Sequence, residues 1–80
     1  MKTTIEVLGP GCFNCRRLEQ AARDAVAIAG VDADIRHVTD DAEIARRGVM
    51  RTPGLVIDGT VVSYGRVPGP REIAEWLPRP

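Results

Sequence analysis

The chain has 80 residues, which is enough for one domain with a small core. Eleven basic and eleven acidic residues give a formal net charge of zero, and neither sign forms a run. A nucleic-acid surface or a membrane-surface patch needs clustered basic residues, so neither is expected. We also expect no membrane span and no secretory leader, and therefore a soluble, cytoplasmic protein.

The first half of the chain predicts two strands joined through a long helix. Residues 3–8 (TTIEVL) are rich in β-branched side chains and run into a Gly-Pro-Gly loop, which predicts a strand followed by a tight turn. Apolar residues then recur at helical spacing over residues 13–29, and Gly30 is placed to end that helix. Residues 32–38 (DADIRHV) alternate in polarity as a second strand would.

The middle of the chain predicts a short helix and a hairpin. Residues 40–43 (DDAE) have the spacing of a capping box and open a helix that Gly48 ends. Residues 55–57 and 60–64 flank Asp58-Gly59, which is a strong signal for a tight β-hairpin turn.

Pro70 suits the first turn of a last helix, and Pro78 ends it. The fold class is therefore α/β, with a single domain over residues 1–80 and the order β-α-β-α-β-β-α. The first two strands should be parallel through a right-handed crossover, and the last two antiparallel.

Both cysteines, Cys12 and Cys15, lie where the Gly-Pro-Gly loop turns into the long helix. A structural staple, a metal site and a redox couple would each use this spacing, but structural disulfides are rare in a reducing compartment. Cys12 is expected at the positive end of the helix dipole, with Arg16 and Arg17 one turn on, so its thiolate is favoured. Cys15 falls on the apolar stripe of the helix and should be shielded. One exposed, activated thiol and one buried thiol is the asymmetry that thiol–disulfide exchange requires.

The succession of strand, loop, GCFNC, helix and then Thr52-Pro53 before a hairpin resembles the thioredoxin superfamily. More narrowly, the chain is similar to the small, glutaredoxin-sized redox-active disulfide proteins of bacteria and archaea. The resemblance covers essentially the whole chain, including GVMRTPGLVIDGTVVSYGRVP. It implies a thioredoxin-like fold with a four-stranded mixed sheet flanked by helices. The expected strand order in space is 32–38, 3–8, 55–57, 60–64.

The resemblance also implies roles for individual residues. Cys12 takes the place of the exposed nucleophile and Cys15 that of the resolving thiol of a thiol–disulfide oxidoreductase. Pro53 falls where the family carries a cis-proline beside the disulfide, Thr52 would offer backbone groups to an extended substrate, and Phe13 would contact that substrate. No cofactor other than a redox-active Cys12–Cys15 disulfide is expected. The expected partners are protein disulfides and a reductase that the sequence does not identify, and the protein is expected to be a monomer.

Two rival functions use the same two thiols. GPGCFNC also resembles the loop of heavy-metal-associated domains, and two thiolates can hold a soft ion such as Cu(I). Those domains run β-α-β-β-α-β, however, whereas this chain is expected to end in a helix. The other rival is a redox-sensing domain whose disulfide state changes its affinity for a partner.

Glu6 lies six residues before Cys12, the spacing at which thioredoxins carry a buried acid. A desolvated carboxyl there would have a raised pKa and could accept a proton from the resolving thiol; the alternative is a glutamate on the polar face of a strand. The only histidine, His37, is expected to be structural or to face solvent at a sheet edge. Phe13, Val49, Met50 and Val67 could form an apolar rim for docking partners, and all of them except Phe13 are equally suited to the core.

Overall fold

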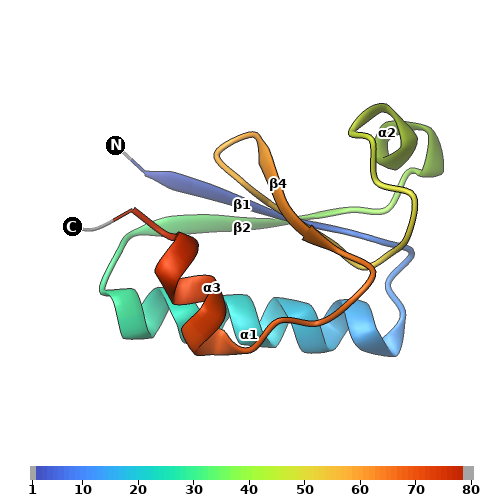
Figure 1. Ribbon diagram of the computed structural model, residues 1–80. Helices are drawn as coiled ribbons and strands as arrows, with labels where there is room; N and C mark the ends of the chain where they lie inside the picture. The colour runs from blue at the N-terminus through green and yellow to red at the C-terminus, as the bar shows by residue number, and fades with distance from the viewer. Residues whose placement is uncertain (1, 79–80) are drawn as a thin grey trace.

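A computed structural model describes residues 2–78. Its seven elements follow the predicted order β-α-β-α-β-β-α (Figure 1). They are β1 (Thr3–Leu8), α1 (Phe13–Ala29), β2 (Ala33–Val38), α2 (Asp41–Arg46), β3 (Gly54–Ile57), β4 (Thr60–Tyr64) and α3 (Pro70–Trp76). The strands begin within a residue of their predicted positions.

The four strands form one mixed sheet in the order β2-β1-β3-β4, as predicted. β1 pairs parallel with β2, and β3 pairs antiparallel with both β1 and β4. Leu8 at the end of β1 lies opposite Gly54 at the start of β3, and Gly54 lies opposite Tyr64 at the end of β4. The loop after β1, the loop before β3 and the loop after β4 therefore meet at the same end of the strands.

The β3–β4 hairpin turns at Asp58 and Gly59, as predicted. Both residues have left-handed backbone conformations, with φ of 48° and 83°, which is the geometry of a tight hairpin turn that matches the twist of its strands. The Asp58 side chain also accepts a hydrogen bond from the Thr4 N–H at 2.9 Å, and the Asp58 N–H donates to the Thr4 carbonyl at 2.8 Å. The turn is thus tied to the inner strand β1 as well as to its own hairpin.

The short helix α2 begins at the predicted cap but without the complete capping box. Asp40 Oδ1 accepts a hydrogen bond from the Ala42 N–H at 3.1 Å. The Glu43 carboxylate does not reach back to the cap, because it accepts hydrogen bonds from Arg46 and Arg47. Ion pairing with the end of the helix has replaced the second half of the box.

The helices cover the two faces of the sheet unequally, with α1 and α3 on one face and α2 on the other (Figure 1). The first face encloses the larger core, which consists of Ile5, Val7, Cys15, Leu18, Ala21, Ala22, Ala25, Leu55, Ile57, Ile73 and Leu77. The second face buries Leu8, Ile44, Val49 and Val56. Within residues 2–78, no helix is long and apolar enough to cross a membrane.

Candidate functional site

Cys12 and Cys15 occupy the two environments that the sequence predicts. Cys12 is the N-cap of α1 and is exposed, whereas Cys15 is 1% exposed and belongs to the larger core. Both are free thiols, and their Sγ atoms lie 2.8 Å apart and are hydrogen bonded. The Cys12 sulfur also accepts a hydrogen bond from the Cys15 N–H at 3.3 Å. The cap of the helix is therefore itself a thiol.

These contacts move the pKa values of the two thiols in opposite directions. Hydrogen bonds from the Cys15 side chain and backbone lower the pKa of Cys12, because they favour its thiolate. Burial raises the pKa of Cys15, and its hydrogen bond to Cys12 raises it further. The first turn of α1 contains no acidic side chain, so nothing there opposes the positive end of the helix dipole. The site presents an accessible, acidic thiol with a shielded thiol directly beneath it.

Gly9, the residue that follows β1, lets the chain pass close to the buried thiol. It is itself buried, and a Cβ atom at this position would collide with the Cys15 Sγ atom. The same Cβ would lie 3.5 Å from the Cβ of Thr52. The backbone of Gly9 therefore lies between the side chains of Cys15 and Thr52, and there is no room for a side chain at Gly9. The sequence predicts a turn at this glycine but not its contact with sulfur, because that contact depends on the packing of three segments.

The Thr52–Pro53 peptide bond, which precedes β3, is cis. Thr52 is exposed and Pro53 is buried, and the Pro53 carbonyl accepts a hydrogen bond from the Gly65 N–H at 3.0 Å. This bond joins the start of β3 to the loop after β4. Thr52 thus lies against Gly9, at the end of the strands where the two cysteines are found.

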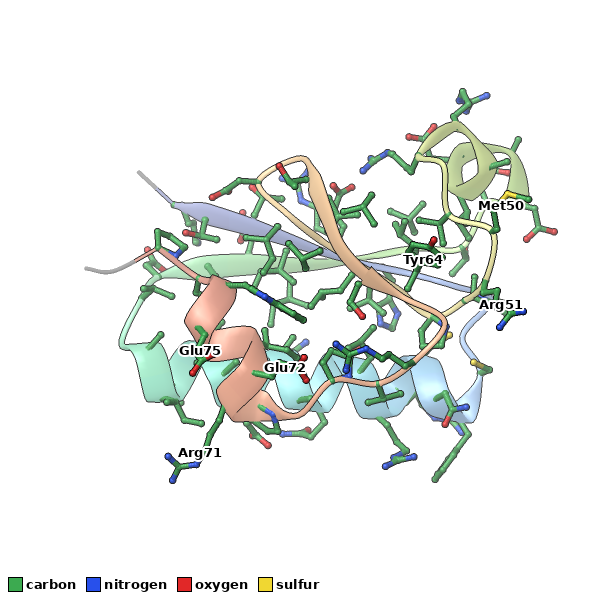
Figure 2. All side chains as sticks on the ribbon, viewed as in Figure 1. Met50, Arg51, Tyr64, Arg71, Glu72 and Glu75 are labelled. Carbon is green, nitrogen blue, oxygen red and sulfur yellow. The ribbon has the colours of Figure 1, made fainter. Side chains whose placement is uncertain are left out.

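The apolar rim is smaller than expected. Phe13 is 67% exposed and Met50 is 86% exposed, and Figure 2 shows Met50 near the end of the molecule where α1 begins. Val49 is buried on the α2 face, and Val67 packs against the larger core. Of the two alternatives for Val49 and Val67, the structure supports the core, because both fill space between elements. Phe13 and Met50 remain as exposed apolar side chains at this end.

Of the two alternatives for Glu6, a desolvated carboxyl with a raised pKa is wrong, and a glutamate on the polar face of β1 agrees with the structure. Its side chain forms a bidentate ion pair with Arg47, at 2.9 and 2.8 Å. This pairing lowers the pKa of Glu6, and the effect outweighs that of burial. A proton acceptor needs the opposite shift, so Glu6 is an anchor for Arg47 on the polar part of the sheet.

His37 lies on the edge strand β2 and is exposed, as expected. Its Nε2 atom lies 2.6 Å from Glu19 Oε1 on α1. This contact joins the edge strand to the helix, which is a structural role.

Metal binding has no further support in the described part of the chain. Across residues 2–78, no group of three or more His, Cys, Asp or Glu side chains lies together in a way that could hold a metal ion. The element order also ends in a helix, unlike the β-α-β-β-α-β order of the heavy-metal-associated domains. A soft ion would have only the two thiols as candidate ligands.

Comparison with known proteins agrees with the fold and the site. Residues 3–78 match the model of a protein family described as a thioredoxin domain. The chain is also 38% identical over 73 residues to a protein named thioredoxin from Methanothermobacter thermautotrophicus, an alignment that covers 91% of this chain and 95% of that protein. A protein of the same name from Methanocaldococcus jannaschii is 40% identical over 73 residues, with 91% of this chain and 84% of that protein covered. The chain belongs to the thioredoxin family. Membership of that family supports a thiol–disulfide oxidoreductase in general terms.

Proposed function

We propose that this protein reduces or exchanges protein disulfides through Cys12 and Cys15. The observation that carries the proposal is the pairing of an exposed thiol of lowered pKa with a buried thiol 2.8 Å away. The couple needs no cofactor of its own. A separate reductase in the cytoplasm would return the electrons, and the protein would act as a monomer.

The first step is the attack of the Cys12 thiolate on a substrate disulfide. A bond forms between the Cys12 sulfur and one substrate sulfur, the substrate S–S bond breaks, and the second substrate sulfur leaves as a thiolate that takes a proton from water. The lowered pKa of Cys12 increases the fraction of thiolate at any given pH, and its exposure at the tip of α1 gives the substrate access.

The second step releases the substrate. Cys15 loses its proton and attacks the Cys12 sulfur, which forms the Cys12–Cys15 disulfide and expels the remaining substrate thiolate, and that thiolate takes up the proton. The substrate gains two electrons and two protons. The protein supplies both electrons and the Cys15 proton, and water supplies the other proton. Formation of the mixed disulfide also removes the thiolate at Cys12. Two of the three causes that raise the pKa of Cys15, the hydrogen bond to Cys12 and the charge of Cys12, are then gone, and burial remains.

Thr52, Pro53 and Phe13 would position the substrate. Thr52 is exposed and lies against Gly9, next to the buried sulfur, so its backbone groups are well placed to pair with an extended chain that brings a disulfide to Cys12. Phe13 is an exposed aromatic side chain directly after the nucleophile and would contact the same segment.

Two single substitutions test the proposal. Cys12→Ser should abolish reduction of a protein disulfide such as that of insulin at its first step. Cys15→Ser should still attack and then stall, so a covalent adduct that dithiothreitol releases should accumulate. Adducts trapped by Cys12→Ser instead would reverse the two roles. Loss of a copurifying metal from both variants, with no adduct from either, would replace the redox proposal by the metal-binding one.

Alkylation of the reduced protein gives an independent measurement. Iodoacetamide should modify Cys12 before Cys15, and the pH dependence of that rate should give Cys12 an apparent pKa below the free-thiol value of about 8.5. Earlier modification of Cys15, as located by peptide mass spectrometry, would contradict the proposed order. A turnover measurement on insulin then separates an oxidoreductase from a redox-sensing domain, because a sensor would show the same alkylation order without multiple turnovers.

A further inference from the structure

The arginines near the two cysteines differ from most others in the chain. Nine arginines lie within residues 2–78, and five of these form ion pairs with a carboxylate: Arg23, Arg36, Arg46, Arg47 and Arg66. Among the described residues, four form no such pair: Arg16, Arg17, Arg51 and Arg71. Three of these four lie within four residues of Cys12, Cys15 or Pro53. We call Arg16, Arg17 and Arg51 the basic rim.

These three residues belong to segments next to the exposed thiol: Arg16 and Arg17 lie near the start of α1, whose cap is Cys12, and Arg51 directly precedes Thr52. The Arg16 N–H donates to the Cys12 carbonyl at 3.0 Å, and the Arg17 guanidinium carbon lies 5.8 Å from the centre of the Phe13 ring. The stem of Arg51 passes along Gly65, where a Cβ atom would lie 3.3 Å from its Cβ and 3.4 Å from its Cδ. Figure 2 shows Arg51 at the end of the molecule where α1 begins, and Arg71 near the opposite end of α1.

Acidic residues are absent from the segments that carry the basic rim. Residues 7–18 and 44–57 contain no Asp or Glu, although the whole chain has eleven. The β1–β3 pairing of Leu8 with Gly54 brings these two segments together. The chain does carry two carboxylates after β2, Asp40 and Asp41. Asp40 is the cap and Asp41 the first residue of α2, which lies on the opposite face of the sheet from α1. A chain with no net charge is therefore locally positive around its reactive sulfur.

We propose that the basic rim docks partners whose disulfide is flanked by acidic side chains, an inference that rests on the proposed function. A guanidinium without an internal partner can bind a carboxylate through two hydrogen bonds, and no existing ion pair has to break. Opposite charges around the reacting sulfurs also raise the rate of encounter, and like charges lower it. The positive field would act on the choice of substrate before any bond between sulfurs forms.

The test compares three synthetic peptides that contain the same intramolecular disulfide. The residues on either side of the cysteines are Glu in the first, Gln in the second and Lys in the third. With dithiothreitol as the terminal reductant and at low ionic strength, we expect kcat/KM for the Glu peptide to exceed that for the Lys peptide about tenfold, the low end of electrostatic steering. The ratio should fall toward one as salt is added, because the screening length shrinks from about 30 Å at 0.01 M to about 3 Å at 1 M.

The variant that tests the basic rim replaces Arg16, Arg17 and Arg51 together by Gln. It should lose most of the Glu-over-Lys preference, whereas Arg71→Gln, which removes the fourth arginine without an ion pair, should keep it. The ratio between peptides is the informative quantity, because any change in the pKa of Cys12 affects all three peptides equally. Equal rates for the Glu and Lys peptides in the unmodified protein, or a preference that survives the triple substitution, would overturn the inference and leave the proposed function intact. Failure to reduce even the Gln peptide would overturn both.

Discussion

The sheet face that packs on α1 and α3 buries eleven core residues, whereas the face that packs on α2 combines four buried side chains with an ion-pair cluster. The central member of that cluster is Arg47, which bonds both Glu6 of β1 and Glu43 of α2. One layer is thus held mainly by apolar contacts, and the other partly by charge.

This difference accounts for the opposite pKa shifts of two groups near the same sheet. On the apolar face, burial raises the pKa of Cys15, which favours its protonated form. On the α2 face, the Arg47 guanidinium lowers the pKa of Glu6. Residue type alone decides neither shift. The shift of Cys15 comes from the apolar side chains packed between α1 and the sheet, and that of Glu6 from the guanidinium at the end of α2. The chemistry is therefore tied to the face with the larger core.

The largest effect is expected when each core is opened by one substitution. Leu18 is fully buried in the larger core, and Leu18→Ala should lower the free energy of unfolding by about 2–5 kcal/mol. Ile44→Ala on the α2 face should fall at the lower end of that range, because its cluster is small and α2 can settle into the space. Urea denaturation measures both. If Ile44→Ala lowers the free energy of unfolding more than Leu18→Ala does, the α2 face contributes more to stability than the size of its core indicates.

A smaller effect is expected at the close approach between Gly9 and the buried thiol. Gly9→Ala would place a methyl group against the Cys15 sulfur, and overpacking of this kind typically costs about 1–3 kcal/mol. It should also slow the release of mixed disulfides, because the resolving sulfur has to move. Gly69→Ala is the control for a methyl group added in open space, since nothing lies within 4 Å of its added Cβ. Gly69 is the N-cap of α3, where Gly is preferred to Ala, so the two variants are compared by activity and not by stability. If Gly9→Ala reduces insulin as fast as Gly69→Ala does, the Cys15 sulfur accommodates the methyl group without a functional cost.

Local signals were sufficient to predict most of the fold. Three local patterns each favour a single structure: the β-branched run over 3–8, the helical spacing over 13–29 and the turn at Asp58-Gly59. The structure confirms all three. The exposure of Cys12 and the burial of Cys15 were also predictable, because both follow from position on a single helix. The relative exposure of two residues within one helical turn can be predicted from the sequence.

The rest depends on which segments meet, and no local signal carries that information. Glu6 was correctly placed on a strand, but its partner Arg47 comes from 41 residues away. The alternation of the strand could not reveal that a cation would cover it. The contact between Gly9 and Cys15 likewise joins a loop to a helix face. Val49 and Val67 looked equally suited to a surface and to a core, and the packing of neighbouring elements decided for the core.

The smallest effect is expected from the ion pair that distinguishes the α2 face. The folded-state pKa of Glu6 is lowered, so the stability that its charge provides is complete above the unfolded-state pKa of about 4.3 and is lost as pH falls through the folded-state value. Glu6→Gln should therefore destabilise the protein by about 1 kcal/mol at neutral pH and reduce its further loss of stability on acidification. Glu72→Gln is the control, because its side chain is 43% exposed where that of Glu6 is 15% exposed, and solvent weakens its pair with Arg66. Thermal melts between pH 7 and pH 3 measure both variants. If the control changes the pH dependence of stability as much as Glu6→Gln does, the Glu6–Arg47 pair contributes no more than an exposed ion pair. The stability of the α2 face would then come from its four buried side chains.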